Sequence, residues 1–284
     1  MWKRWTWRAA RCVAISYLLL LLVMMWFETT LIFPRWAIQP GDWEPTEFTF
    51  EDVNFQSADG TRLHGWYFPH PTATLQVLYC HGNGEDVAAL GPYMDLLRTR
   101  HQVSVFAFDY RGYGRSEGKP DEAGVLADGR AAQQWLAQQA HIRPEQVVLW
   151  GRSIGGAVAV QLAADLGAHG LILERTFTNL PDVAAYHYSW LPVRRLMRNR
   201  FDSLARIGEY RGPLLQSHGT ADEVVPFQLG QALYEAAAAS PKQFVTMPGV
   251  THNGPNDEDY YTELARFLDH LRANNLNRSP EVQP

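Results

Sequence analysis

Cysteine is scarce in this sequence, which contains only two such residues, Cys12 and Cys80, among 284. Cys12 lies in an apolar N-terminal segment and Cys80 lies in a predicted core strand, so we expect no disulfide between them. No group of cysteines and histidines has the spacing of a zinc site. We therefore expect neither a metal nor an organic cofactor. Two cysteines do not identify a redox compartment.

An excess of positive charge is also missing. Lysine and arginine total 25 against 30 aspartates and glutamates, which gives a formal net charge of −5. A protein that binds nucleic acid needs a basic patch or stripe, so we expect no nucleic-acid partner. With 46% hydrophobic and 19% charged residues, the composition is that of a globular protein. The length suits one large domain or two small ones.

Long apolar runs are absent except for one near the N-terminus. An uncharged run extends from Cys12 to Phe27 and follows a segment that carries Lys3, Arg4, Arg8 and Arg11 but no acidic residue. Continued to Phe33, the run provides about 22 residues, or roughly 33 Å of helix, which is enough to span a bilayer. We expect a transmembrane helix, with Glu28 near the far interface, where its charge reaches headgroups and water.

The fate of this N-terminal segment has two readings. The sequence ETTLIFPRW that follows offers no small-residue cleavage site, which favours a retained signal-anchor over a cleaved signal peptide. The cleaved peptide remains the alternative. Basic residues precede the span and acidic residues follow it, so we expect the N-terminus in the cytoplasm and the rest of the protein on the extracytoplasmic, or periplasmic, side.

Beyond the span, apolar strands alternate with helices. Residues 34–46 read as a linker, and a β-hairpin with an Asp59-Gly60 turn opens a domain that we place at 47–273. Further apolar runs at 75–80, 102–110, 146–150, 170–174, 213–218 and 243–247 predict strands. This alternation indicates an α/β fold with a mostly parallel eight-stranded sheet and helices on both faces. The polar segment 274–284 is expected to be a disordered tail.

A long insertion separates the strands that end at Glu174 and begin at Pro213. It occupies about 176–212 and contains several aromatic residues and arginines. Ligand sites in open α/β sheets lie beyond the carboxyl ends of the strands, and this segment begins at such an end. A short helical cap over a ligand site and an ordinary helical connection both fit it.

Ser153 stands in the pentapeptide Gly151-Arg152-Ser153-Ile154-Gly155, which matches G-x-S-x-G. A predicted strand precedes the pentapeptide and a predicted helix follows it, the context in which this motif forms a sharp turn that exposes a nucleophilic serine. The pentapeptide alone is weak evidence, and a loop rich in small residues is the alternative. The strand and helix favour a nucleophile.

A nucleophilic serine needs a general base, and the base needs an acid that orients it. Asp222 and His252 follow two later strands, at the same edge of the sheet as Ser153. We assign Asp222 as the acid in preference to Glu223 and Glu174, and His252 as the base. Other histidines, His218 among them, read as surface, cap or strand-end residues.

The oxyanion of an acyl-transfer intermediate needs hydrogen-bond donors. We expect the backbone N–H of Ile154 to be one, because it follows the nucleophile, and that of Asn83 to be the other. Gly82 and Gly84 allow the Asn83 backbone to approach the site closely. His81 then has a structural role.

The ordered set HGNG, DYRGYGRSEG, GRSIGG, HGTADEVVP and GVTHN resembles the α/β-hydrolase superfamily, from about Leu31 to Leu271. It looks most like a membrane-anchored branch that includes depalmitoylases, lysophospholipid lipases and relatives of serine aminopeptidases. The resemblance implies the same five roles for Ser153, Asp222, His252, Asn83 and Ile154. The chain departs from the branch at Thr251, where glycine is common.

These observations predict a serine hydrolase of carboxylic esters or thioesters, with acyl or lipid-like substrates. Peptidase or amidase chemistry on the same three residues is the second reading, and a catalytically silent, membrane-tethered binding protein is the third. The sequence leaves open the substrate, the acyl-chain length and the oligomeric state.

Overall fold

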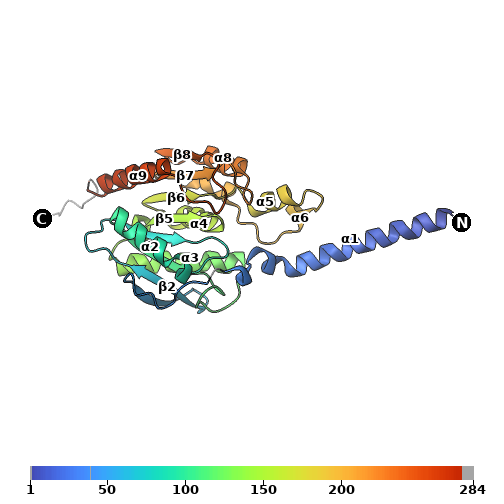
Figure 1. Ribbon diagram of the computed structural model, residues 1–284, viewed down its shortest axis with the longest axis horizontal. Helices are drawn as coiled ribbons and strands as arrows, with labels where there is room; N and C mark the ends of the chain where they lie inside the picture. The colour runs from blue at the N-terminus through green and yellow to red at the C-terminus, as the bar shows by residue number, and fades with distance from the viewer. Residues whose placement is uncertain (1, 39, 277–284) are drawn as a thin grey trace.

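The computed structural model describes residues 2–38 and 40–276. A long N-terminal helix, α1 (Trp2–Ile32), projects from one end of a layered α/β domain, and the C-terminal helix ends at the opposite end (Figure 1). Among the described residues, α1 is the one helix that is both long and apolar enough to cross a membrane. The expected N-terminal apolar helix is therefore present as a candidate span.

One eight-stranded sheet forms the centre of the domain, in the order β1-β2-β4-β3-β5-β6-β7-β8. The strand β2 runs antiparallel to its neighbours β1 and β4, and all pairs from β4 to β8 are parallel. The mostly parallel sheet with an opening hairpin is confirmed. The strands are β1 (Glu51–Gln56), β2 (Arg62–Phe68), β3 (Gln76–Cys80), β4 (Ser104–Asp109), β5 (Val148–Arg152), β6 (Gly170–Glu174), β7 (Leu214–Gly219) and β8 (Lys242–Met247).

Helices cover both faces of this sheet (Figure 1). Side chains of α2 and α9 join one buried apolar cluster, and side chains of α3, α4 and α8 join the other. Consecutive residues of the central strands alternate between the two clusters, because side chains along a strand point to opposite faces. The helices are α2 (Val87–His101), α3 (Glu122–Gln139), α4 (Ile154–Leu166), α8 (Phe227–Ala236) and α9 (Glu258–Leu276), with single 3-10 turns at η1 (Arg35–Ala37) and η2 (Pro144–Gln146).

The C-terminal helix continues further than the sequence suggested. We expected a disordered tail from residue 274, but α9 runs to Leu276. The Asn275 side chain donates a hydrogen bond to the backbone oxygen of Thr74 at 3.1 Å, so polar residues of this last turn still contact the domain. The rest of the expected tail, 277–284, lies outside the described residues.

The insertion between β6 and β7 is helical and lies beside α1 at the same end of the domain (Figure 1). It contains α5 (Leu180–His187), α6 (Val193–Leu196), α7 (Ser203–Arg206) and the 3-10 turn η3 (Ile207–Glu209). We call residues 176–212 the cap. The segment was expected to be either a short helical cap or an ordinary helical connection. In the structure it is helical and contacts α1.

Glu28 is the main point of contact between α1 and the cap. We expected its carboxylate to reach headgroups and water, but its side chain is buried. It accepts hydrogen bonds from the backbone N–H groups of Arg198 and Asn199, both at 2.8 Å. The Arg198 guanidinium adds a bond at 3.1 Å. A buried carboxylate requires such donors, and no local sequence pattern reveals partners 170 residues away.

Candidate active site

Ser153 occupies a strained turn between β5 and α4. Its backbone has φ +55° and ψ −121°, a conformation that side-chain-bearing residues rarely adopt. A Cβ on Gly151 would meet the carbonyl oxygen of Gly155 at 2.3 Å, and a Cβ on Gly155 would meet that of Cys80 at 2.0 Å. Both glycines are therefore required by close backbone contacts, and the turn lifts the serine hydroxyl out of the sheet.

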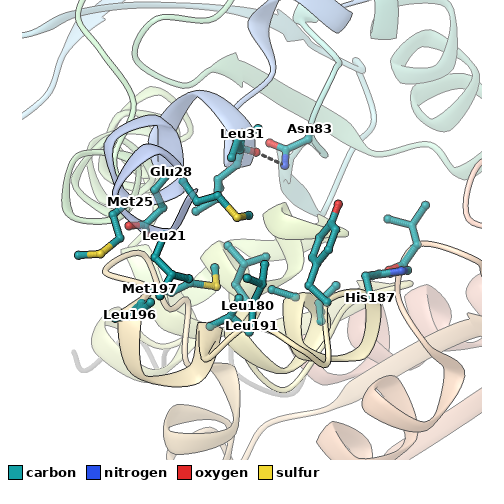
Figure 2. A pocket seen from close by; sticks show the side chains of 17 residues that line it. Leu21, Met25, Glu28, Leu31, Asn83, Leu180, His187, Leu191, Leu196 and Met197 are labelled. Carbon is teal, nitrogen blue, oxygen red and sulfur yellow. Dashed lines mark hydrogen bonds between the residues drawn. The ribbon is translucent and has the colours of Figure 1, made fainter. Parts of the chain in front are cut away.

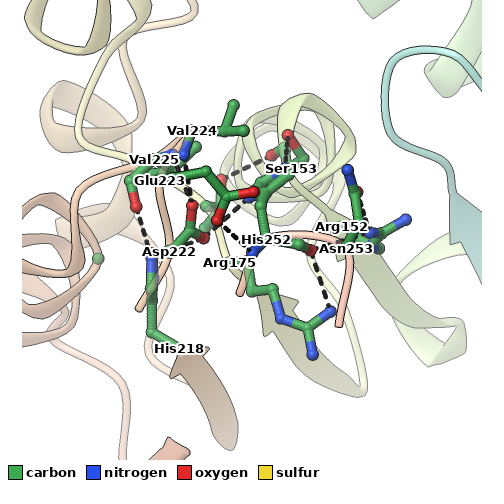
Figure 3. Close-up of polar contacts among 12 residues, drawn as sticks. Arg152, Ser153, Arg175, His218, Asp222, Glu223, Val224, Val225, His252 and Asn253 are labelled. Carbon is green, nitrogen blue, oxygen red and sulfur yellow. Dashed lines mark hydrogen bonds and ion pairs between the residues drawn. The ribbon is translucent and has the colours of Figure 1, made fainter. Parts of the chain in front are cut away.

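The structure brings Ser153, His252 and Asp222 together in one chain of contacts (Figure 3). His252 Nε2 lies 3.2 Å from Ser153 Oγ, and His252 Nδ1 lies 2.8 Å from Oδ2 of Asp222. An ionised carboxylate only accepts hydrogen bonds. The Nδ1 atom therefore carries the proton, and Nε2 faces the serine hydroxyl as an acceptor. This is the arrangement that a general base needs.

The Asp222 side chain is fully buried and surrounded by donors. Its Oδ1 atom accepts the backbone N–H groups of Val224 and Val225 at 3.0 and 2.7 Å. Burial by itself would raise the pKa of this carboxyl. Hydrogen bonds from His218 and His252 outweigh that effect and hold the pKa well below its ordinary value. Asp222 is consequently ionised at neutral pH.

His218 is a residue that sequence reasoning missed. It was expected to be a surface, cap or strand-end residue. It does lie at the end of β7, but it is buried, with Nε2 3.2 Å from Oδ2 of Asp222 and 3.0 Å from the backbone oxygen of Val225. With two acceptors facing it, Nε2 carries the proton. His218 thus donates to the same carboxylate oxygen as His252, and its position four residues before Asp222 was the available signal.

Two arginines, also missed, hold the loop that carries His252 (Figure 3). The backbone oxygen of His252 accepts hydrogen bonds from Arg152 at 3.0 Å and from Arg175 at 3.3 Å. Arg152 also pairs with Glu85, in the loop after β3. Arg152 lies inside the serine pentapeptide and Arg175 directly follows β6, so both extend from strand ends toward the same loop.

Of the two expected oxyanion donors, Ile154 directly follows Ser153 in the chain, and Asn83 follows Gly82, which lies close to the serine. Ile154 is the first residue of α4, where backbone N–H groups lack helical partners. In the described chain, the N–H groups of Asn83 and Ile154 donate to no other protein group. A Cβ on Gly82 would lie 3.5 Å from Ser153 Cβ, so the loop before Asn83 passes close to the serine. The oxyanion role of these amides stays a prediction.

The Asn83 side chain ties this loop to the rest of the molecule. Its Nδ2 atom donates to the backbone oxygen of Ile32, the last residue of α1, at 2.7 Å. Its Oδ1 atom accepts the Tyr113 hydroxyl at 3.1 Å. The ring of His81, expected to be structural, is buried and contacts Gly82 O at 2.7 Å. The loop is therefore held from both sides.

The two rival acids have other partners. Glu174 is buried and accepts hydrogen bonds from Trp150, at 3.0 Å, and from Tyr260. Glu223 lies beside the site, and its carboxylate accepts the backbone N–H of His252 at 3.3 Å. Of these carboxylates, Asp222 is the one that contacts the His252 ring. Across residues 2–38 and 40–276, no group of three His, Cys, Asp or Glu side chains is arranged to hold a metal ion.

Comparison with known proteins places this chain among hydrolases. A family model described as serine aminopeptidase, S33, matches residues 71–202. An uncharacterized protein of Mycobacterium tuberculosis is 44% identical over 208 residues, which cover 72% of this chain and 73% of that protein. The alpha/beta hydrolase domain-containing protein WAV2 of Arabidopsis thaliana is 32% identical over 243 residues, which cover 78% of this chain and 79% of WAV2.

Among solved structures, an esterase of Pyrococcus furiosus superposes with a TM-score of 0.69 at 19% identity. The superposition covers 83% of this chain and 96% of the esterase. At that identity the likeness concerns the fold alone. The fold, the family model and the relatives nevertheless agree with one another.

Proposed function

This chain belongs to the α/β-hydrolase superfamily, and we propose that it is a serine hydrolase that cleaves carboxylic esters or thioesters through an acyl-enzyme. The observation that carries the proposal is the contact chain from Ser153 through His252 to Asp222 at a strained strand-to-helix turn. Strain of this kind persists where the surrounding structure maintains it for function. Here the cramped glycines Gly151 and Gly155 maintain it.

The proposed reaction has two halves. Ser153 Oγ attacks the carbonyl carbon of the substrate while His252 Nε2 takes the hydroxyl proton, and the amides of Asn83 and Ile154 stabilise the oxyanion. The bond to the leaving alcohol or thiol then breaks, and that group receives the proton from His252. Water then attacks the carbonyl carbon of the acyl-serine while His252 takes one of its protons. The bond between that carbon and Ser153 Oγ breaks, His252 returns the proton to Oγ, and the acid product leaves.

We also propose that α1 is a retained membrane anchor, with the N-terminus in the cytoplasm and the domain on the extracytoplasmic side. The basic residues before the apolar run support this orientation. A C-terminal fusion to a reporter enzyme that is active only outside the cytoplasm tests it. Activity of the reporter in intact cells is expected, and an inactive reporter on a stably expressed fusion would reverse the proposed topology.

Aminopeptidase or amidase chemistry is the second candidate, because the matching family model carries that description. An aminopeptidase needs a free carboxylate near the site for the substrate's ammonium group. Besides Asp222, two acidic residues near the proposed base are engaged: Glu85 pairs with Arg152, and Glu223 accepts the His252 N–H. This favours esters and thioesters over amino-terminal peptides.

The proposed function is tested by labelling the full-length protein with a fluorophosphonate, which reacts with activated serines. Wild type and Ser189→Ala, a change at an exposed cap serine, are expected to label, whereas Ser153→Ala is not. A panel of p-nitrophenyl esters and aminoacyl-anilides then separates the two chemistries. Absence of labelling on folded wild-type protein would favour a silent binding protein, and faster turnover of anilides than of esters would favour the peptidase.

A further inference from the structure

An apolar pocket lies between α1 and the cap (Figure 2). Its volume is about 450 Å³, within the range of small-molecule sites. From the cap it is lined mainly by aliphatic side chains, among them Leu180, Val183 and Leu191. From the other side it is lined by α1. The proposed anchor therefore forms one wall of this apolar pocket.

One face of α1 forms that wall. Leu21, Met24, Glu28 and Ile32 all line the pocket, and their spacing of three or four residues places them on the same side of the helix. Neighbouring positions such as Leu22 and Val23 are exposed. Because the run 12–27 is uncharged on every side of the helix, this part of the sequence does not mark which face the domain uses.

The pocket extends along the part of α1 that would lie in the membrane. Tyr17, further toward the N-terminus, donates from its hydroxyl to the backbone oxygen of Trp190 in the cap at 3.0 Å. Tyr17 and Glu28 are eleven residues apart, or roughly 16 Å along the helix, about half the thickness of a hydrocarbon core. The cap therefore contacts α1 over a length similar to the thickness of one leaflet, from Glu28 to Tyr17.

Two residues of the pocket lining are neighbours of the proposed reacting groups. Asn83, whose amide is a proposed oxyanion donor, lines it from one side. Val224, whose N–H bonds Asp222, lines it from the other. Three polar side chains of the lining are engaged elsewhere: Glu28 by Arg198 and Asn199, Asn83 by Tyr113 and Ile32, and His187 by the backbone oxygen of Val224. The rest of the lining is apolar apart from the Tyr188 hydroxyl, so a ligand meets mainly hydrocarbon surface.

We propose that α1 is part of the substrate site, and that the pocket holds the hydrocarbon chain of an acyl ester or thioester drawn sideways from the bilayer. The inference rests on the proposed function, because the carbonyl of that substrate is the group that Ser153 attacks. A chain in one leaflet reaches the pocket along α1 without crossing water. The anchor then selects substrates as well as holding the enzyme at the membrane.

The test uses the full-length protein in lipid nanodiscs and compares p-nitrophenyl butyrate with p-nitrophenyl octanoate. Burying a methylene in the pocket is worth up to about fourfold in kcat/KM. Wild type is expected to prefer the octanoate by at least about tenfold. Met24→Trp, from the α1 side, and Ala184→Phe, from the cap side, fill the pocket and are expected to reduce the preference to about twofold or less.

Val23→Trp is the matched control, since it adds the same side chain on the exposed face of α1 and is expected to keep the wild-type preference. Fluorophosphonate labelling of each variant reports whether the site is folded. If both pocket variants label and keep the octanoate preference, or if Val23→Trp loses it equally, the proposal is wrong while butyrate hydrolysis still supports the serine hydrolase. If wild type neither labels nor hydrolyses butyrate, the proposed function itself fails.

Discussion

Removal of the Glu28 carboxylate is expected to detach the cap from α1. In Glu28→Ala, the backbone donors of Arg198 and Asn199 lose acceptors at 2.8 Å, and the Asn199 side chain loses one at 3.1 Å. A buried donor without a partner costs about 1–3 kcal/mol. With two unpaired backbone donors, partly solvated by water that enters the space left by the side chain, the free energy of cap opening should fall by about 3 kcal/mol.

Glu28→Gln separates hydrogen bonding from charge. The Gln oxygen can keep the three hydrogen bonds made by Oε1, and only the ion pair with Arg198 is lost. That guanidinium is 67% exposed, so solvent screens the pair and its loss costs at most about 1 kcal/mol. The alanine variant should therefore open far more readily than the glutamine variant.

Limited digestion with trypsin measures this difference, because the cap carries several arginines. When opening is fast relative to cleavage, the digestion rate follows the population of the open form. A loss of 3 kcal/mol predicts cap cleavage about a hundredfold faster in Glu28→Ala and less than about tenfold faster in Glu28→Gln. Glu47→Ala, at an exposed position before β1, should match wild type. Equal cleavage of the alanine and glutamine variants would refute the reasoning.

Two further predictions concern the proposed base and a buried histidine. In Asp222→Asn, an amide NH₂ faces His252 Nδ1 and selects the tautomer with its proton on Nε2, toward Ser153, so kcat for a short ester should fall about 10⁴-fold; a loss under tenfold would contradict the assignment. Burial and the nearby Arg100 and Arg272 charges lower the pKa of His101 to about 4 from 6.5. As pH falls below 6.5, the unfolded chain takes up the proton first, so stability should decline by about 3 kcal/mol down to pH 4. The melting temperature of His101→Gln should fall less between pH 6.5 and pH 4 than that of wild type. Identical pH profiles of the two melting temperatures would rule out the contribution of His101.

The alternation of strands and helices was predictable because each buried strand reads as a continuous apolar run between turn residues. The serine turn was predictable for a related reason, since close backbone contacts at Gly151 and Gly155 leave only glycine possible there. Asp222 and His252 followed from their places after strands, where parallel topology brings strand ends to one edge. Each of these features depends either on residues that are close in the sequence or on the order of strands in the sheet.

What the sequence did not reveal depends on contacts between distant segments. Glu28 was assigned to the membrane interface because its partners, Arg198 and Asn199, lie in the cap. A histidine at the end of a buried strand can contact any of several polar groups there. Only the fold shows that His218 contacts Asp222. The face of α1 that lines the pocket was also not predictable. The run 12–27 is uncharged on every side, so its sequence does not distinguish side chains that contact protein from side chains that contact lipid.

The ties between α1 and the domain have a mechanical consequence. A domain joined to its membrane helix by one flexible linker can rotate relative to that helix. Here three residues at different positions along α1, Tyr17, Glu28 and Ile32, each form a hydrogen bond with the domain. Helix and domain must therefore tilt together. A bilayer whose thickness changes the inclination of the helix would rotate the whole body with it, and the loop that carries Asn83 would move as part of that rigid unit.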